Sequence, residues 1–177
     1  HRPYAAQSED WAALLYTSGT TGKPKGAMLS QKNLLSNAQT LVEAWRFTEA
    51  DRLLHMLPIF HAHGLFVAGN TCLCAGASLL FEPAFSPDRF FERVQDATCF
   101  MAVPTLYGRL LKDTRLAPSA VGHMRLFTSG SAPLDAVASD AFEARAGSRI
   151  LERYGMTETL MLTSNPYDGD RRAGTVG

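Results

Sequence analysis

The sequence predicts an α/β fold, a parallel β-sheet covered by helices, and two observations carry this prediction. Short apolar runs alternate along the chain with segments in which apolar residues recur at helical spacing. Strands that are apolar along most of their length are typical of parallel sheets, because helices cover both faces of such a sheet. No internal repeat, low-complexity tract or linker interrupts the alternation, and 177 residues are enough for one large domain with a buried core.

The expected strands are six short apolar segments. The first, WAALLYTS at residues 11–18, is expected to be buried and to lead into a loop rich in glycine and threonine. The others are RLLHML (52–57), ASLLF (77–81), CFMAV (99–103), MRLFTSG (124–130) and RILERYG (149–155).

Helices are expected in the intervening segments. Ser30 fits the N-cap of a helix in which apolar residues from Leu34 to Trp45 follow helical spacing. Ser86 and Pro87 open another helix, which runs to Ala97, because proline is tolerated in the first helical turn. Further helices are expected at residues 64–77 and 106–112.

The last expected helix ends at Gly147, because glycine is favoured just beyond a helix C-terminus. It leads into the strand expected at residues 149–155 and completes the alternation of helices and strands. Its apolar face is expected to consist of Leu134, Val137, Ala138, Ala141 and Phe142.

The composition argues against several classes of function. Seventeen basic and seventeen acidic residues cancel, and no run of like charge stands out, which disfavours a nucleic-acid-binding surface. No apolar stretch reaches the ~18 residues that a membrane span needs. Cys72, Cys74 and Cys99 fit neither a disulfide framework nor a two-pair zinc site, so we expect reduced thiols in a cytoplasmic protein. The oligomeric state stays open.

Three polar loops follow expected strands: TSGTTGKPKG after Leu15, TSGSAPL after Phe127 and YGMTET after Leu151. Because ligands bind at the carboxyl ends of strands in parallel sheets, these loops are expected to converge on one site. The first loop has the parts of a polyphosphate cradle: glycines that expose backbone N–H groups, hydroxyl donors and two lysines. It is not a Walker loop, which would need glycine at position 17 and serine or threonine at 24, and composition alone leaves a flexible surface loop open.

The order of the residues goes further than their composition. YTSGTTGKPKGAMLS (16–30) resembles the phosphate-binding signature of the adenylate-forming superfamily, which includes acyl-CoA synthetases, luciferases and adenylation domains. TSGSAPL (128–134) looks like the adenine-side loop of that family, ERYGMTET (152–159) like its Y-G-x-T-E motif, and PIFHAHG (58–64) like the segment lining its acyl pocket. Within the superfamily, FHAHGLF and ERYGMTET resemble the malonyl-CoA synthetases.

The resemblance implies that residues 1–177 are part of the large N-terminal AMP-binding domain of such an enzyme. It also implies that the chain ends before the ribose-binding aspartate, the hinge and the small C-terminal domain whose lysine contacts the reacting carboxylate. The beginning of the large domain is expected to be missing as well. The fragment alone is therefore expected to be poorly active or inactive, although the protein it comes from is an enzyme.

The implied reaction has two steps and uses ATP, Mg²⁺ and coenzyme A. A carboxylate attacks the α-phosphate of ATP to give an acyl-adenylate and pyrophosphate, and a thiol then takes the acyl group. Thr157, Glu158 and Lys25 are the catalytic candidates; Glu158 and Thr17 would bind Mg²⁺, and Tyr154 would stack on adenine. The ATP-binding residues implied by the motifs are Thr17, Ser18, Gly19, Thr20, Thr21, Gly22, Lys23, Pro24, Lys25, Gly130, Ser131, Ala132, Tyr154, Gly155, Met156 and Thr157.

Three residues suggest a second carboxylate on the substrate. Arg153 is costly to bury unless it meets an anion, and its planar fork suits a carboxylate. His61 and Ser131 would add donors beside it, and Met161 would line the same pocket. The resemblance to malonyl-CoA synthetases implies the same use of these positions, with malonate or methylmalonate as the acid.

Other interpretations stay open. Arg153 could pair with Glu152 or another acidic neighbour, His61 also fits relatives with monocarboxylate substrates, and Met161 could be plain core. A metal site at His61 and His63 is disfavoured, because no further ligand stands at suitable spacing nearby. The alternatives to a dicarboxylate ligase are a monocarboxylate–CoA ligase and an inactive nucleotide-binding fragment. Amino-acid activation is disfavoured, because PIFHAHG lacks an aspartate to hold an α-amino group.

Overall fold

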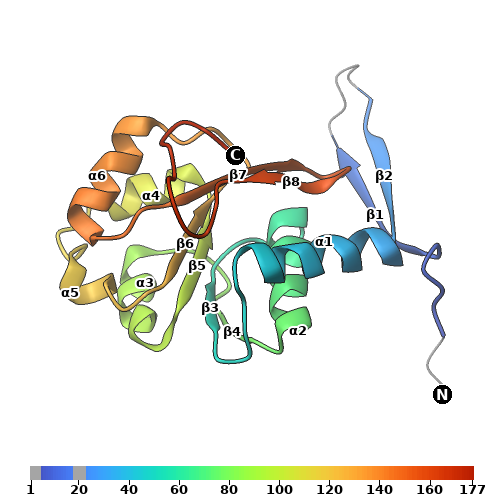
Figure 1. Ribbon diagram of the computed structural model, residues 1–177, viewed down its shortest axis with the longest axis horizontal. Coiled ribbons are helices and arrows are strands. Elements are labelled where there is room, and N and C mark those ends of the chain that lie inside the picture. Colours follow the sequence, from blue (N-terminus) through green and yellow to red (C-terminus); the bar gives the residue numbers. More distant parts are fainter. Residues whose placement is uncertain (1–4, 18–22) are drawn as a thin grey trace.

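Six strands form the central sheet of the protein, and they confirm the α/β class. The computed structural model describes residues 5–17 and 23–177. The strands are β3 (Arg52–His55), β4 (Ser78–Phe81), β5 (Cys99–Ala102), β6 (Leu126–Ser129), β7 (Leu151–Met156) and β8 (Leu160–Ser164). Their order is β4-β3-β5-β6-β7-β8, and every pair is parallel except β7 with β8 (Figure 1). The expected parallel sheet is therefore present, with one antiparallel strand added at its edge.

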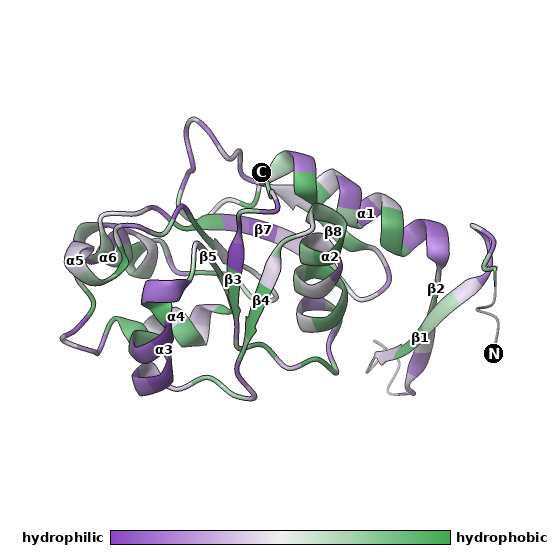
Figure 2. Ribbon diagram, turned by 90° about the horizontal axis from the view of Figure 1, so that it is seen from below, coloured by the Kyte–Doolittle hydropathy of each residue, from purple (hydrophilic) through white to green (hydrophobic). Residues whose placement is uncertain are grey.

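Helices cover both faces of this sheet. They are α1 (Gln31–Ala44), a π-helix (His63–Asn70), α2 (Thr71–Ala75), α3 (Pro87–Arg93), a 3₁₀ turn (Val94–Asp96), α4 (Pro104–Leu110), α5 (Pro118–Val121) and α6 (Ala136–Ala146). Figure 1 shows α1 and α2 on one side of the strands and α3 to α6 on the other. In Figure 2, β5 is hydrophobic throughout, whereas hydrophobic and hydrophilic residues alternate along α1, as expected for a helix with one buried face.

Two hydrophobic cores lie on the two faces. Under α3, α4 and α6, the rings of Phe90, Phe100, Tyr107 and Phe142 stack edge to face in a chain, with ring centroids 4.9–6.1 Å apart. The other core lies under α1, the π-helix and α2, and includes the fully buried Trp45. Together they fix the strands whose carboxyl ends carry the polar loops.

The helix ends follow their sequence signals. Ser30 Oγ accepts a hydrogen bond from the backbone N–H of Asn33 (3.2 Å), and the Asn33 side chain accepts one from the N–H of Ser30 (2.9 Å), which forms a capping box. Ser86 caps α3 by accepting a hydrogen bond from the backbone N–H of Arg89 through its Oγ (3.1 Å), with Pro87 in the first turn. Gly147 ends α6 in the left-handed conformation, at a φ of 72°. These three predictions are confirmed.

The first expected strand is present but was placed wrongly. β1 (Trp11–Thr17) pairs antiparallel with β2 (Lys25–Ser30) in a separate hairpin, which lies at the end of the molecule opposite α5 and α6 (Figure 1). It is not buried, since the side chains of Trp11, Leu14 and Tyr16 are exposed. The connection between the two strands is too short for the crossover of about a dozen residues that a parallel pair requires.

Two smaller expectations also need correction, and two elements were not expected. The helix expected at 64–77 is a π-helix followed by α2, which Gly76 ends at a φ of 69°. Val137 lies outside the apolar face of α6 and is 74% exposed, because the buried stripe runs through Ser139, Phe142 and Ala146. β8 and α5 were not expected. In the described part of the chain no helix is both long and apolar enough to cross a membrane, and all three cysteines are free.

Candidate active site

A cavity of about 560 Å³ opens where β1, β6 and β7 end. Its walls come from the end of β1, the segment before and within the π-helix, the loop after β6, and β7 with the turn that follows it. The loops after β6 and β7 therefore converge as expected. Thr17, with which the first loop begins, lies at the same cavity at the end of the hairpin strand β1, and residues 18–22 of that loop lie outside the described residues. The predicted site residues that line this cavity are Thr17, His61, Ser131, Arg153, Gly155, Met156, Thr157, Glu158 and Met161.

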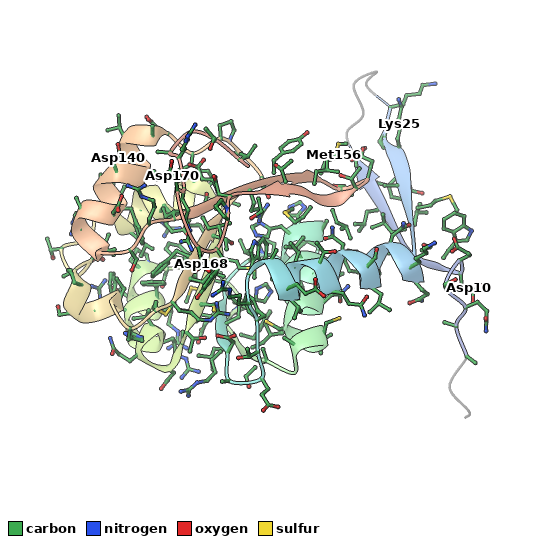
Figure 3. The ribbon with its side chains drawn as sticks, viewed as in Figure 1. Asp10, Lys25, Asp140, Met156, Asp168 and Asp170 are labelled. Carbon is green, nitrogen blue, oxygen red and sulfur yellow. The ribbon has the colours of Figure 1, made fainter. Side chains whose placement is uncertain are left out.

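The other predicted residues lie elsewhere. Tyr154 is 48% exposed and does not line the cavity. Lys25 starts β2, and Figure 3 shows its side chain pointing away from Met156. Gly130 lies against the guanidinium of Arg153. Lys23, Pro24 and Ala132 are exposed outside the cavity lining, and Ser18, Gly19, Thr20, Thr21 and Gly22 lie outside the described residues.

Arg153 is a buried cation at the wall of the cavity. It is 2% exposed, and among the described residues no carboxylate forms an ion pair with it. Glu152 cannot serve, because its carboxylate accepts a hydrogen bond from the N–H of Gly174 at 3.0 Å on the other side of the strand. The interpretation of Arg153 as a salt-bridged residue is therefore wrong. Burial lowers the pKa of its guanidinium to about 10.

Two nitrogens of this guanidinium are left unsatisfied. Nη2 contacts Nε2 of His63, whereas Nε and Nη1 are buried and have no hydrogen-bond partner among residues 5–17 and 23–177. The space for the guanidinium depends on Gly130, since a Cβ at that position would lie 2.2 Å from Nη1. Unsatisfied buried donors are rare and costly, so this pair of N–H groups indicates a place for an acceptor that the described part of the chain does not supply.

His63 completes the surroundings of Arg153. Its Nδ1 lies 3.2 Å from the hydroxyl of Ser131, and its Nε2 faces the guanidinium. A guanidinium only donates, so Nε2 must accept, and the proton of the neutral ring must sit on Nδ1 and point at Ser131. Burial, with the positive charges of Arg153 and His55, lowers the pKa of His63 well below its usual value and keeps the ring neutral.

Ser131 reaches His63 from an unusual backbone conformation. Its φ is 69°, in the left-handed region that favours glycine. Such residues cluster at functional sites, where the surrounding structure holds them in place. The contact with His63 gives the hydroxyl of Ser131 a defined position at the wall of the cavity.

The histidine that contacts Arg153 is His63, whereas His61 was predicted to add a donor beside it. His61 lines the cavity, but it is exposed and its ring packs on Phe60, with centroids 4.5 Å apart. His63 is the first residue of the π-helix. The buried residues of this helix are His63, Gly64, Val67 and Ala68. Grouping the apolar residues of FHAHGLFVAG by helical face would have placed His63, not His61, on the buried side.

The cavity lining also carries oxygen atoms that can act as metal ligands. Thr17, Thr157 and Glu158 all line it and supply two hydroxyls and one carboxylate. Mg²⁺ prefers oxygen ligands, retains several waters, and is usually bound through one or two carboxylates and the phosphates of a substrate. This set of oxygen atoms fits Mg²⁺ delivered with a nucleotide.

We expect the free energy of unfolding to fall as the pH drops below about 6.5. Burial lowers the pKa of His55 and of His63, so both rings bind a proton less readily in the folded protein than in the unfolded chain, in which a histidine binds one near pH 6.5. The unfolded state then binds more protons, and each histidine removes up to about 1.4 kcal/mol of stability per pH unit. Urea denaturation from about pH 7.5 to 5 measures this slope. An unchanged slope in His63→Gln would contradict the assignment.

Comparisons with known proteins place the chain. The family model described as AMP-binding enzyme matches residues 1–177. The malonate–CoA ligase of Arabidopsis thaliana is 41% identical over 96% of this chain, and the sulfoacetate–CoA ligase of Cupriavidus necator is 40% identical over 94% of it. The crystal structure of ATP-bound MatB from Rhodopseudomonas palustris is 58% identical, with a TM-score of 0.94 over 97% of this chain and 34% of that chain. The chain spans about a third of the length of these curated relatives, 31% and 33%. It belongs to the AMP-binding enzyme family.

Proposed function

We propose that the protein containing this chain is an ATP-dependent carboxylate–CoA ligase whose substrate is a small dicarboxylate, with malonate or methylmalonate as the best candidates. The observation that carries the proposal is the orphaned guanidinium of Arg153 at the wall of the cavity. Membership of the AMP-binding family and the identity to malonate–CoA ligase support the same reaction.

The distal carboxylate would be held by Arg153. Its two oxygens would accept hydrogen bonds from Nε and Nη1, the two donors that have no partner. His63 occupies the remaining face of the guanidinium through Nη2 and so fixes its plane. A monocarboxylate of similar size would leave the cation buried and unpaired, which makes it a poor substrate.

The reacting carboxylate would lie at the other part of the cavity, near Thr157. Its oxygen attacks the α-phosphorus of ATP, the bond to the bridging oxygen breaks, and pyrophosphate leaves. Bound Mg²⁺, held by Glu158 and Thr17, would neutralise phosphate charge there. The hydroxyl of Thr157 would donate to the α-phosphate, where charge develops, and Lys25 would act on the outer phosphates from the hairpin. The thiol of CoA then attacks the acyl carbonyl and AMP leaves.

The test is acid-dependent exchange between ATP and pyrophosphate with the full-length protein. We expect malonate or methylmalonate to support exchange more than roughly 100-fold better than acetate, because acetate leaves the guanidinium unpaired. Succinate measures the tolerated length, and sulfoacetate tests whether a sulfonate can replace the distal carboxylate. A preference for acetate would support the monocarboxylate alternative. ATP binding without exchange with any acid would support the inactive nucleotide-binding alternative.

A cytoplasmic location, proposed from the reduced thiols, agrees with the three free cysteines.

A further inference from the structure

Two side-chain contacts join α1 to β8. The half-buried Asn37 uses both ends of its amide on the backbone of Met161: Nδ2 donates to the carbonyl oxygen at 2.9 Å, and the N–H of Met161 donates to Oδ1 at 3.3 Å. Near the other end of β8, Nε1 of Trp45 donates to Oγ of Ser164 at 3.0 Å. The amide of Asn37 thus makes the pair of hydrogen bonds that a further strand would make at Met161.

β8 needs such a contact because its pairing with β7 is irregular. It is an edge strand of the central sheet, so β7 is its only strand partner in the described part of the chain. Gly155 pairs with Met161 but Tyr154 pairs with Thr163, which leaves one extra residue in β8. Leu160 has a φ of 57°, in the left-handed region. The bulge leaves Leu162 without a partner in β7 and disrupts the ladder locally.

The turn between the two strands carries the catalytic candidates and has an open space behind it. Thr157 and Glu158 line the main cavity. A second hollow of about 280 Å³ lies between this turn and α1, and Glu158 also borders that hollow. The turn is therefore a thin wall between two spaces. Its position depends on its two ends, which are β7 on one side and the Asn37–Met161 contact on the other.

We propose that Asn37 is a positioning residue for the adenylation step. By fixing Met161, it sets the register of β8 and holds Thr157 and Glu158 at the nucleotide end of the cavity. The side chain of Met161, which lines the same cavity, is positioned with them. Asn37 does not line this cavity, so its effect reaches the reaction only through the turn. This inference rests on the proposed function, since the turn matters only if nucleotide and metal bind there.

The test compares Asn37→Asp and Asn37→Ala with Ser164→Ala in the full-length protein. Asn37→Asp keeps the shape but replaces the donor by an acceptor that faces the Met161 carbonyl. Ser164→Ala removes the contact with Trp45 at the end of β8 that lies away from the turn. We expect the two Asn37 variants to lose roughly 10- to 100-fold in kcat for malonate-dependent exchange and to need more Mg²⁺ for half-maximal rate. Ser164→Ala should keep both values, even where its melting temperature falls as far.

Hydrogen exchange of the amides from 157 to 161 gives a readout that does not depend on activity. We expect faster exchange there in Asn37→Ala than in Ser164→Ala or the wild type. Unchanged hydrogen exchange of these amides in Asn37→Ala would overturn the role of Asn37. Equal losses of kcat in the Asn37 and Ser164 variants would overturn it as well. If the wild type shows no acid-dependent exchange between ATP and pyrophosphate, the proposed function fails. The hydrogen exchange of the turn and the affinity for Mg²⁺–ATP then decide the role of Asn37 separately: a lower affinity in Asn37→Ala alone supports it, and equal affinities overturn it.

Discussion

Replacement of Arg153 by methionine is expected to lower kcat/KM for malonate by two to three orders of magnitude and to raise the melting temperature of the ligand-free protein. The catalytic loss follows from removing the charged partner of a desolvated carboxylate, which costs about 2–5 kcal/mol. The gain in stability follows because the guanidinium is buried without an anion, so the folded protein no longer carries the cost of desolvating it. A residue kept only for stability would change both quantities in the same direction.

Acetate and a second arginine provide the controls. Exchange with acetate, which has no distal carboxylate, should change little in Arg153→Met, so the ratio of malonate to acetate collapses. Arg109→Met removes an exposed guanidinium that lies 4.8 Å from the centre of the Phe85 ring and outside the cavity, and it should leave that ratio unchanged. Exchange assays with both acids and thermal denaturation measure the two effects. If Arg153→Met uses malonate normally, the distal carboxylate does not bind here.

Gly155→Ala is expected to reduce the adenylation rate by roughly 100-fold or more, through a displacement of about 1 Å in the turn that carries Thr157 and Glu158. A Cβ at this position would lie 2.0 Å from the carbonyl oxygen of Leu160, which is backbone and cannot rotate away. The two strands must then separate where their pairing is already bulged. Overpacking of this kind also lowers the free energy of unfolding by about 1–3 kcal/mol.

Gly108→Ala is the matched control for Gly155→Ala. Gly108 lies in α4, and a Cβ there would have no atom within 4 Å. Alanine should stabilise this helix by about 0.5–1 kcal/mol and leave the reaction unchanged. Chemical denaturation and the malonate-dependent exchange assay are measured on both variants. Normal activity in Gly155→Ala would show that the reaction does not depend on the close approach of β7 and β8.

The sequence predicted the elements whose signals are local. The inner strands of the sheet are apolar runs, and the helix ends at Ser30, Ser86 and Gly147 rest on contacts within a few residues. An apolar run does not reveal its partner strand, so β1 was expected in the central sheet, whereas it pairs with β2 across a short connection. β8 was not predicted, because its pairing depends on a bulge and on a contact with Asn37, 124 residues away in the sequence.

The candidate site was predictable in its residues and less so in its contacts. The motifs named Thr17, Ser131, Thr157 and Glu158, and one cavity brings all four together. The cost of burying an arginine pointed to Arg153 before its surroundings were known. Which of His61 and His63 contacts Arg153 depends on the buried face of the helix. FHAHGLF reveals that face only once the helix is known to begin at His63.

The π-helix that begins at His63 gives this cavity a second way to change. A π-helix closes its hydrogen bonds one residue further along the chain than an α-helix does. Deletion of one residue between 64 and 70 would convert the segment toward an α-helix. The residues before the deletion would then rotate about the helix axis by about 100° relative to the buried residues after it. His63 would then leave Arg153, although no cavity residue had been substituted. Changes of segment length, and not only point substitutions, are therefore a route by which a descendant of this protein could acquire a different acid.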